Sequence, residues 1–142
     1  MENMDTRKEF EKFMGATDTI ALATSVEDIP NVRFVNIIYF ANEKFVYFQS
    51  KKGDRKEKEF EKNQNVAFIT FPNSDSAYVR VCHGIVKKSK KTIFDVQDTF
   101  IEKMPFYKGL IERNGNSMDL YEIHFSTAEV YPNPDEFFIL EL

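Results

Sequence analysis

Short apolar runs separated by brief turns fill most of this sequence of 142 residues. The runs are rich in β-branched and aromatic residues, which favour strands. They cover residues 18–25, 32–41, 44–50, 65–71, 77–89, 119–131 and 136–142. Consecutive strands joined by short turns favour an antiparallel barrel over alternating β and α units. We therefore expect six or seven strands in one antiparallel barrel.

Three short helices are expected beside these strands. Residues 5–15 place Phe10, Phe13 and Met14 on one face, and residues 91–104 carry a similar apolar stripe that ends before Pro105. A third, highly charged helix follows Gly53. Residues 41–44 are expected to be a tight connection between two strands. No repeat, low-complexity tract or Pro/Gly-rich linker divides the chain, so residues 1–142 are expected to be a single domain of the mainly β (α+β) class.

Composition limits the classes of function. Hydrophobic residues make up 42% of the chain, which fits a folded protein, and fifteen phenylalanines suggest a core of phenyl rings. The net charge of -4 argues against a nucleic-acid partner. No apolar stretch reaches the roughly 18 to 20 residues that span a membrane, and the charged start is not expected to be a secretory signal.

The single cysteine, Cys82, cannot form an internal disulfide, which suggests a reducing, cytoplasmic location. Cys82 lies in an apolar run without a second cysteine nearby, so we expect a buried structural thiol. The two histidines, His83 and His124, lie in separate strand-like runs, and no cysteine cluster completes a metal set. A metal site is therefore not expected. Motifs for nucleotide, serine or zinc hydrolysis are also missing from the sequence.

A cluster of positive charge surrounds Gly53, directly behind the strand at residues 44–50. The cations are Lys51, Lys52, Arg55 and Lys56. The start of a helix offers free backbone N–H groups and a positive dipole end, which attract phosphate. Cations in a first turn are repelled by the positive end of that dipole, which lowers stability. A bound phosphate would attract both the cations and the dipole and so offset this cost. The alternative is a plain solvated helix, and spacing alone leaves both interpretations open.

Arg33 is the second unusual residue, because it interrupts the apolar strand at residues 32–41. An arginine in such a strand must face solvent or pair with another group. Taken alone, the position favours the simpler alternative, an arginine that faces outward.

Together these stretches resemble the pyridoxamine-phosphate-oxidase-like family of flavin-binding split barrels. The resemblance covers about residues 18–90 and rests on the order and spacing of several short elements. They are Ala23 with Thr24, Pro30, Arg33 with Val35, Phe48 with Ser50, Arg55 with Lys56, and Asn65 with Val66 and Ala67.

The resemblance implies a homodimeric split barrel with flavin mononucleotide (FMN) near the dimer interface. It also implies an oxidoreductase that passes a hydride or electrons between the flavin and a small-molecule substrate. The cofactor-binding residues that it implies fall in three groups. Arg33, Phe34, Val35 and Asn36 would run along the flavin and its ribityl chain, Gln49 and Ser50 would contact it from the next strand, and Arg55, Lys56 and Lys52 would hold the phosphate.

Three departures from the family pattern argue against the oxidation of pyridoxamine phosphate itself. Ile38 stands where the oxidase of vitamin B6 metabolism has a lysine, Val79 stands where the family has a glutamine, and the chain has no tryptophan. Two alternatives therefore stay open beside an FMN-dependent oxidoreductase. One is a module that binds flavin or haem without turnover, and the other is a structural or regulatory domain with an empty barrel.

Overall fold

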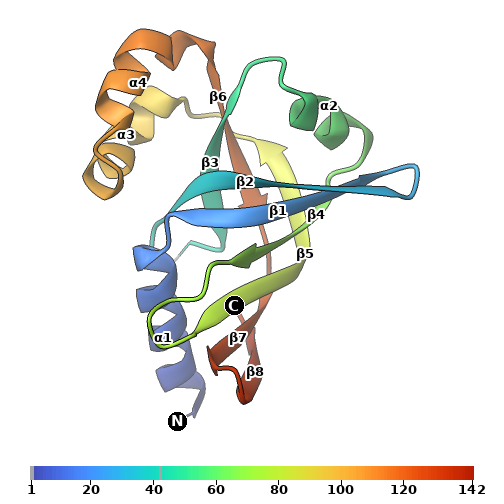
Figure 1. Cartoon of the computed structure of the whole chain (residues 1–142), viewed down its shortest axis with the longest axis vertical. Helices are drawn as coiled ribbons and strands as arrows, with labels where there is room; N and C mark the ends of the chain where they lie inside the picture. Colours follow the sequence, from blue (N-terminus) through green and yellow to red (C-terminus); the bar gives the residue numbers. More distant parts are fainter. Residues whose placement is uncertain (1, 42) are drawn as a thin grey trace.

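A computed structural model describes residues 2–41 and 43–142 of the chain. Eight strands and four α-helices occur in these residues (Figure 1). In chain order they are α1 (Glu2–Ala16), β1 (Thr19–Val26), β2 (Ile29–Tyr39), β3 (Phe45–Lys51), α2 (Arg55–Lys62), β4 (Asn65–Thr70), β5 (Tyr78–Lys88), α3 (Ile93–Lys103), α4 (Tyr107–Asn114), β6 (Met118–His124), β7 (Thr127–Asn133) and β8 (Glu136–Glu141). A short 3₁₀ turn, Gly115–Ser117, joins α4 to β6.

The strands form one antiparallel sheet in the order β4-β1-β2-β3-β6-β5-β7-β8. A further pairing of β4 with β5 closes the first six strands into a barrel. Strand β5 is long enough to pair with β6 through its second half and with β7 through its first half. The β7–β8 hairpin therefore extends the barrel wall below the closed part (Figure 1).

Most of the predicted elements are confirmed, with two corrections. Residues 119–131 form two strands, not one, because the chain bends at Ser126. The positions that face the barrel core are odd-numbered before the bend, at Ile123 and Phe125, and even-numbered after it, at Ala128 and Val130. Helix α4 was not predicted, since its sequence carries few apolar residues and includes a glycine. The predicted connection at residues 41–44 contains residue 42, which lies outside the described residues.

Two hydrophobic cores hold the fold together. The first fills the barrel, where Phe48, Phe68 and Ile123 pack together and where Phe10 and Met14 of α1 join them. The second lies outside the barrel wall, between β2, β3 and β6 on one side and α3 and α4 on the other. Helices α3 and α4 are therefore anchored against the outer surface of β2, β3 and β6 (Figure 1).

The prediction of a buried Cys82 is wrong, because this cysteine is exposed. Val81 points into the barrel, and the alternation of the strand sends Cys82 to the outer surface. There its thiol donates a hydrogen bond to Glu129 Oε2 at 3.0 Å. That hydrogen bond to Glu129, together with burial, raises the pKa of Cys82, so the thiol is not activated as a nucleophile.

In the described part of the chain, every helix is too short or too polar to span a membrane.

Candidate functional site

The alternation of β2 sends neighbouring residues to two different environments. Arg33 belongs to the inward-facing set, and its Cα lies opposite that of Leu22 of β1. Phe34 and Asn36 belong to the outward-facing set, together with Ile38 of the second core. Strand β3 divides in the same way, since Phe48 faces the barrel and Tyr47 faces α3 and α4. The predicted site residues are therefore distributed over two regions.

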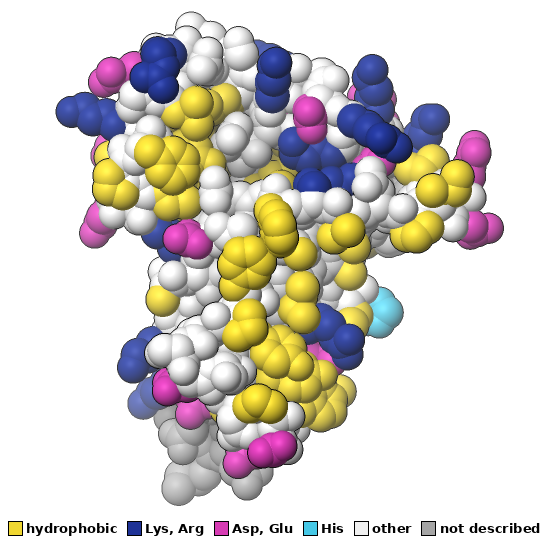
Figure 2. Space-filling view, viewed as in Figure 1, with side chains coloured by type: hydrophobic (Ala, Val, Ile, Leu, Met, Phe, Trp, Pro, Cys, Tyr) yellow, Lys and Arg dark blue, Asp and Glu magenta, His cyan; other side chains and the backbone are white. Residues whose placement is uncertain are grey.

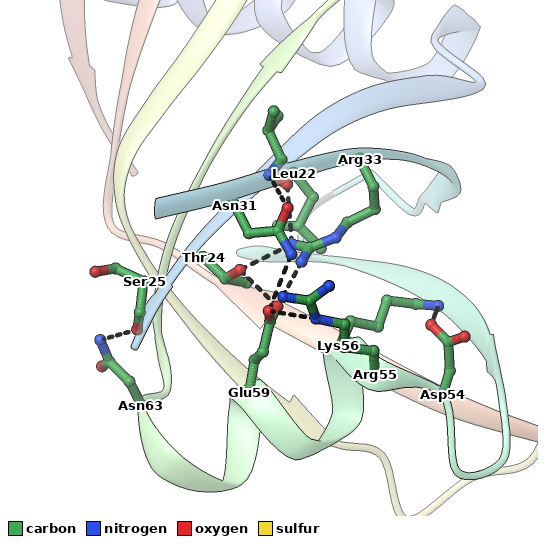
Figure 3. Close-up of polar contacts among 11 residues, drawn as sticks. Leu22, Thr24, Ser25, Asn31, Arg33, Asp54, Arg55, Lys56, Glu59 and Asn63 are labelled. Carbon is green, nitrogen blue, oxygen red and sulfur yellow. Dashed lines mark hydrogen bonds and ion pairs between the residues drawn. The ribbon is translucent and has the colours of Figure 1, made fainter. Parts of the chain in front are cut away.

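The first region is a network around Glu59 of α2, in which Glu59 meets side chains from β1 and β2 (Figure 3). Arg33 forms an ion pair with Glu59 and also donates to Thr24 Oγ1 at 3.0 Å. Thr24 Oγ1 in turn donates to Glu59 Oε1 at 2.7 Å, and Asn31 Nδ2 donates to Glu59 Oε2 at 3.0 Å. Arg55 Nε approaches the same carboxylate at 3.7 Å. We call these five residues the Glu59 network.

Electrostatics agree with this arrangement. Burial by itself would raise the pKa of Glu59, but the hydrogen bonds from Asn31 and Thr24 and the charge of Arg33 outweigh it, so the pKa is lowered. Arg33 therefore neither faces bulk solvent nor stands free for a ligand in this structure, because its guanidinium is engaged by groups of the protein itself.

The second region is a pocket of about 500 Å³ on the outer side of β2 and β3. Its walls come from these strands, from α2, from α4 and from the turn before β6. The lining residues are Phe34, Val35, Asn36, Gln49, Ser50, Lys51, Lys56, Leu110, Asn114, Ser117 and Met118. The volume lies within the range of about 300–1,000 Å³ that is usual for small-molecule sites.

Lys56 brings a positive charge to this pocket from the first turn of α2. Its side chain is only 12% exposed, and its Nζ contacts Asp54 Oδ2 at 2.7 Å. The hydrogen bond from Lys56 lowers the pKa of Asp54. The chain reaches this turn through Gly53, whose φ of 80° favours glycine. The local sequence thus presents Lys56 to the pocket, whereas the Arg55 side chain is 82% exposed.

A pair of buried acids lies next to the pocket, beneath Ser50. Asp119 of β6 is directly opposite Ser50 in the antiparallel register, and Glu57 of α2 is also buried. Glu57 Oε1 accepts a hydrogen bond from Gly53 N at 3.3 Å, but within the described residues its Oε2 has no partner. Burial raises the pKa of Glu57, and the charge of Asp119 adds to the effect while Ser50 opposes it.

Six of the nine predicted cofactor-binding residues line this one pocket, namely Phe34, Val35, Asn36, Gln49, Ser50 and Lys56. The other three, Arg33, Lys52 and Arg55, do not. Lys51 belonged to the predicted cationic cluster but not to the predicted cofactor-binding residues. Sequence reasoning missed the residues from α4, from the turn that follows it and from the start of β6. The α4 residues could not be placed, because α4 itself was not expected. A role in binding FMN stays a prediction for all nine residues.

The outer face of β2, β1 and β4 is apolar and borders the pocket (Figure 2). Phe34 and Ile69 lie in one row on either side of Ala21, and they are 66% and 38% exposed. The ring of Phe71 packs edge-on against Phe34, with 5.1 Å between the centroids. Val32 is also exposed on this face. Exposed apolar patches of this kind often mark an interaction surface.

Among residues 2–41 and 43–142 there is no group of three or more histidine, cysteine or acidic residues that could hold a metal ion.

Comparison with known proteins identifies a family whose model matches this chain. The family model described as pyridoxamine 5'-phosphate oxidase-like matches residues 13–133. No curated protein matches the chain by sequence.

Solved structures share the fold at low sequence identity. General stress protein 26 from Bacillus anthracis str. Sterne has a TM-score of 0.72 and 18% identity, over 96% of this chain and 100% of that one. An FAD-binding protein from Mesorhizobium loti has a TM-score of 0.61 and 15% identity, over 85% of this chain and 88% of that one. A heme binding protein from Mycobacterium smegmatis has a TM-score of 0.76 and 11% identity, over 95% of this chain and 57% of that one.

Proposed function

The chain belongs to the pyridoxamine 5'-phosphate oxidase-like family, and we propose that it is an FMN-dependent oxidoreductase acting on a small molecule. The observation that carries the proposal is the pocket between β2, β3, α2 and α4. It combines a lysine whose side chain is only 12% exposed, an apolar wall and side-chain amides within one volume of about 500 Å³. The structural neighbours include one protein described as FAD-binding, which supports a flavin ligand.

The residues of the pocket suit the parts of FMN. A phosphate needs cations and hydrogen-bond donors, which Lys56, Lys51 and the hydroxyl of Ser50 supply. The flat isoalloxazine ring needs apolar contact, which Phe34 and Leu110 offer. Its polar edge needs hydrogen bonds, and the side-chain amide of Gln49 can make them.

FMN would supply the chemistry of hydride or electron transfer, while the protein binds and orients it. In this proposal Lys56 neutralises the phosphate and is itself held in place by Asp54. The Glu59 network keeps α2 fixed on the barrel, so that Lys56 and Ser50 stay on the same side of the pocket. The protein need not provide a nucleophile.

Haem is the alternative ligand, because one structural neighbour is described as heme binding. The residues that line the pocket include no histidine, cysteine or tyrosine, which are the usual axial ligands together with methionine. Met118 is the one side chain of that kind among them. The composition of the pocket therefore favours flavin.

We also propose that the protein is a homodimer that pairs through the apolar face of β2, β1 and β4. Phe34 belongs both to this face and to the pocket, so a second copy on the face would cover the flavin from outside. Light scattering should give a mass of twice 16.7 kDa, and a monomer would exclude this arrangement.

The test of the proposed function uses the purified full-length protein. We expect a flavin absorbance spectrum or, for protein that loses its ligand, quenching of FMN fluorescence on titration. NADH and NADPH oxidation should then be measured with and without electron acceptors. Bound FMN without any turnover would support the non-catalytic binding module, and protein that binds no FMN would contradict the proposal.

A further inference from the structure

A single buried hydroxyl group links two of the polar residues of the pocket. Tyr107 is the first residue of α4, and its side chain is 1% exposed within the second core. Its hydroxyl lies 3.0 Å from Asn36 Oδ1 and 3.5 Å from Gln49 Nε2. Tyr107 is 71 residues from Asn36 in sequence, so only the docking of α4 brings them together.

The hydrogen bonds of Asn36 fix the direction in which the hydroxyl donates. Asn36 Nδ2 already donates to Thr19 Oγ1 at 3.1 Å and to Asp18 O at 3.3 Å. Both ends of the Asn36 amide are thus in use, and Oδ1 must be the group that faces Tyr107. A hydroxyl carries one proton, which Tyr107 gives to Asn36.

The Tyr107 hydroxyl can therefore only accept a hydrogen bond from Gln49. Gln49 turns its Nε2 toward Tyr107, and its Oε1 has no hydrogen-bond partner among the described residues. Gln49 is half-buried and lines the pocket. Burial raises the pKa of Tyr107, more than the hydrogen bond from Gln49 lowers it, so the phenol keeps its proton at neutral pH.

We propose that Tyr107 is a positioning residue that makes Gln49 present its carbonyl oxygen to the ligand, so that the pocket selects a flavin ring with a free N–H at position 3. This inference rests on the proposed flavin function and adds the feature by which the ligand is recognised. The polar edge of the isoalloxazine ring has one N–H between two carbonyl groups. An acceptor held in the pocket matches that N–H and loses its partner when the nitrogen is methylated.

The test compares two ligands, FMN and 3-methyl-FMN, on three proteins. The wild-type protein should prefer FMN by about tenfold, the order expected for one well-placed hydrogen bond. In Tyr107→Phe the Gln49 amide is free to turn, and the preference should fall to about twofold, while the Kd for 3-methyl-FMN changes little. Tyr47→Phe is the matched control, because Tyr47 is also buried in the second core, whereas the hydroxyl that contacts Asn36 and Gln49 belongs to Tyr107. It should keep the wild-type preference.

A second readout needs no flavin. In the isotope-labelled protein without ligand, the side-chain amide signals of Gln49 should shift in Tyr107→Phe and stay in place in Tyr47→Phe. Unmoved Gln49 signals, or a Tyr107→Phe protein that keeps the full tenfold preference, would overturn the role of Tyr107 while FMN binding stands. Wild-type protein that binds neither flavin would overturn the proposed function and the selectivity together, and the Gln49 signals would then report on the positioning alone.

Discussion

Helix α2 borders two regions, the Glu59 network and the pocket, and its charged residues have different surroundings in each. On one side, Glu59 is surrounded by hydrogen-bond donors from β1 and β2. Arg33, Thr24 and Asn31 compensate the cost of burying its carboxylate. On the other side, Lys56 and Glu57 lie beside the pocket, and Glu57 keeps one buried oxygen without a partner in the described part of the chain. The first side is a closed network, and the second has unmet polar groups.

This difference separates structural charges from charges available to a ligand. Two cations that sequence reasoning assigned to FMN, Arg33 and Arg55, interact with Glu59. Lys56, which is next to Arg55 in sequence, lines the pocket instead, and its Nζ pairs with Asp54 and not with Glu59. We therefore expect mutations on the Glu59 side to lower stability and mutations on the pocket side to lower affinity.

Removal of the Glu59 charge should have the largest effect. Glu59→Gln leaves the half-buried Arg33 without its counter-ion and should reduce the free energy of unfolding by about 2–3 kcal/mol, which is below the range for a fully buried pair. Chemical denaturation measures the loss. Glu61→Gln, on an exposed position of the same helix, should change it by less than about 0.5 kcal/mol. Equal losses in the two variants would show that the network does not stabilise the fold.

The next effect separates two neighbouring cations of α2. Lys56→Ala should raise the Kd for FMN by about 10- to 30-fold, because it removes a charge-assisted contact to the phosphate. Arg55→Ala should change the Kd by less than about threefold, since its side chain is exposed and directed to Glu59. Fluorescence titration measures both values. A larger loss in Arg55→Ala than in Lys56→Ala would reverse the assignment of the two sides.

The smallest effect is an opposite response to pH. The pKa of Glu59 is lowered in the folded protein, so its stabilisation is present above about pH 4.5 and is lost as pH falls through the folded pKa. The pKa of Glu57 is raised, so its protonated form is favoured in the folded state, and stability is lost as pH rises from about 4.5 through the folded pKa.

Unfolding measured between pH 4 and 8 should therefore distinguish the two glutamates. As pH rises, the free energy of unfolding of Glu57→Gln should increase relative to wild type, whereas that of Glu59→Gln should decrease relative to wild type. Parallel curves for the two variants would show that the two sides of α2 do not differ in electrostatics.

The barrel could be predicted from sequence because its signals are local. Strand runs such as residues 44–50 carry the alternation, and Gly53 marks the start of α2. Alternation also contained the information that Arg33 and Phe34 face different environments, but not the partner that Arg33 would meet. Glu59 lies 26 residues away and reaches Arg33 only after α2 docks.

The pocket was predicted in part for the same reason. Gln49 and Ser50 could be proposed from the resemblance, since they end a recognisable strand. The contribution of α4 depends on the second core, which forms from segments distant in sequence, such as Tyr47 and Ile111. No local pattern reports that Tyr107 will meet Asn36.

The proposed function requires that the pocket side of α2 hold the flavin phosphate while the Glu59 network remains intact. A crystal structure of the protein with bound FMN tests it most directly. We expect a phosphate oxygen within hydrogen-bond distance of Lys56 Nζ, with the ion pair between Arg33 and Glu59 preserved. A phosphate bound by Arg33 with that pair broken, or FMN bound outside the pocket, would contradict it.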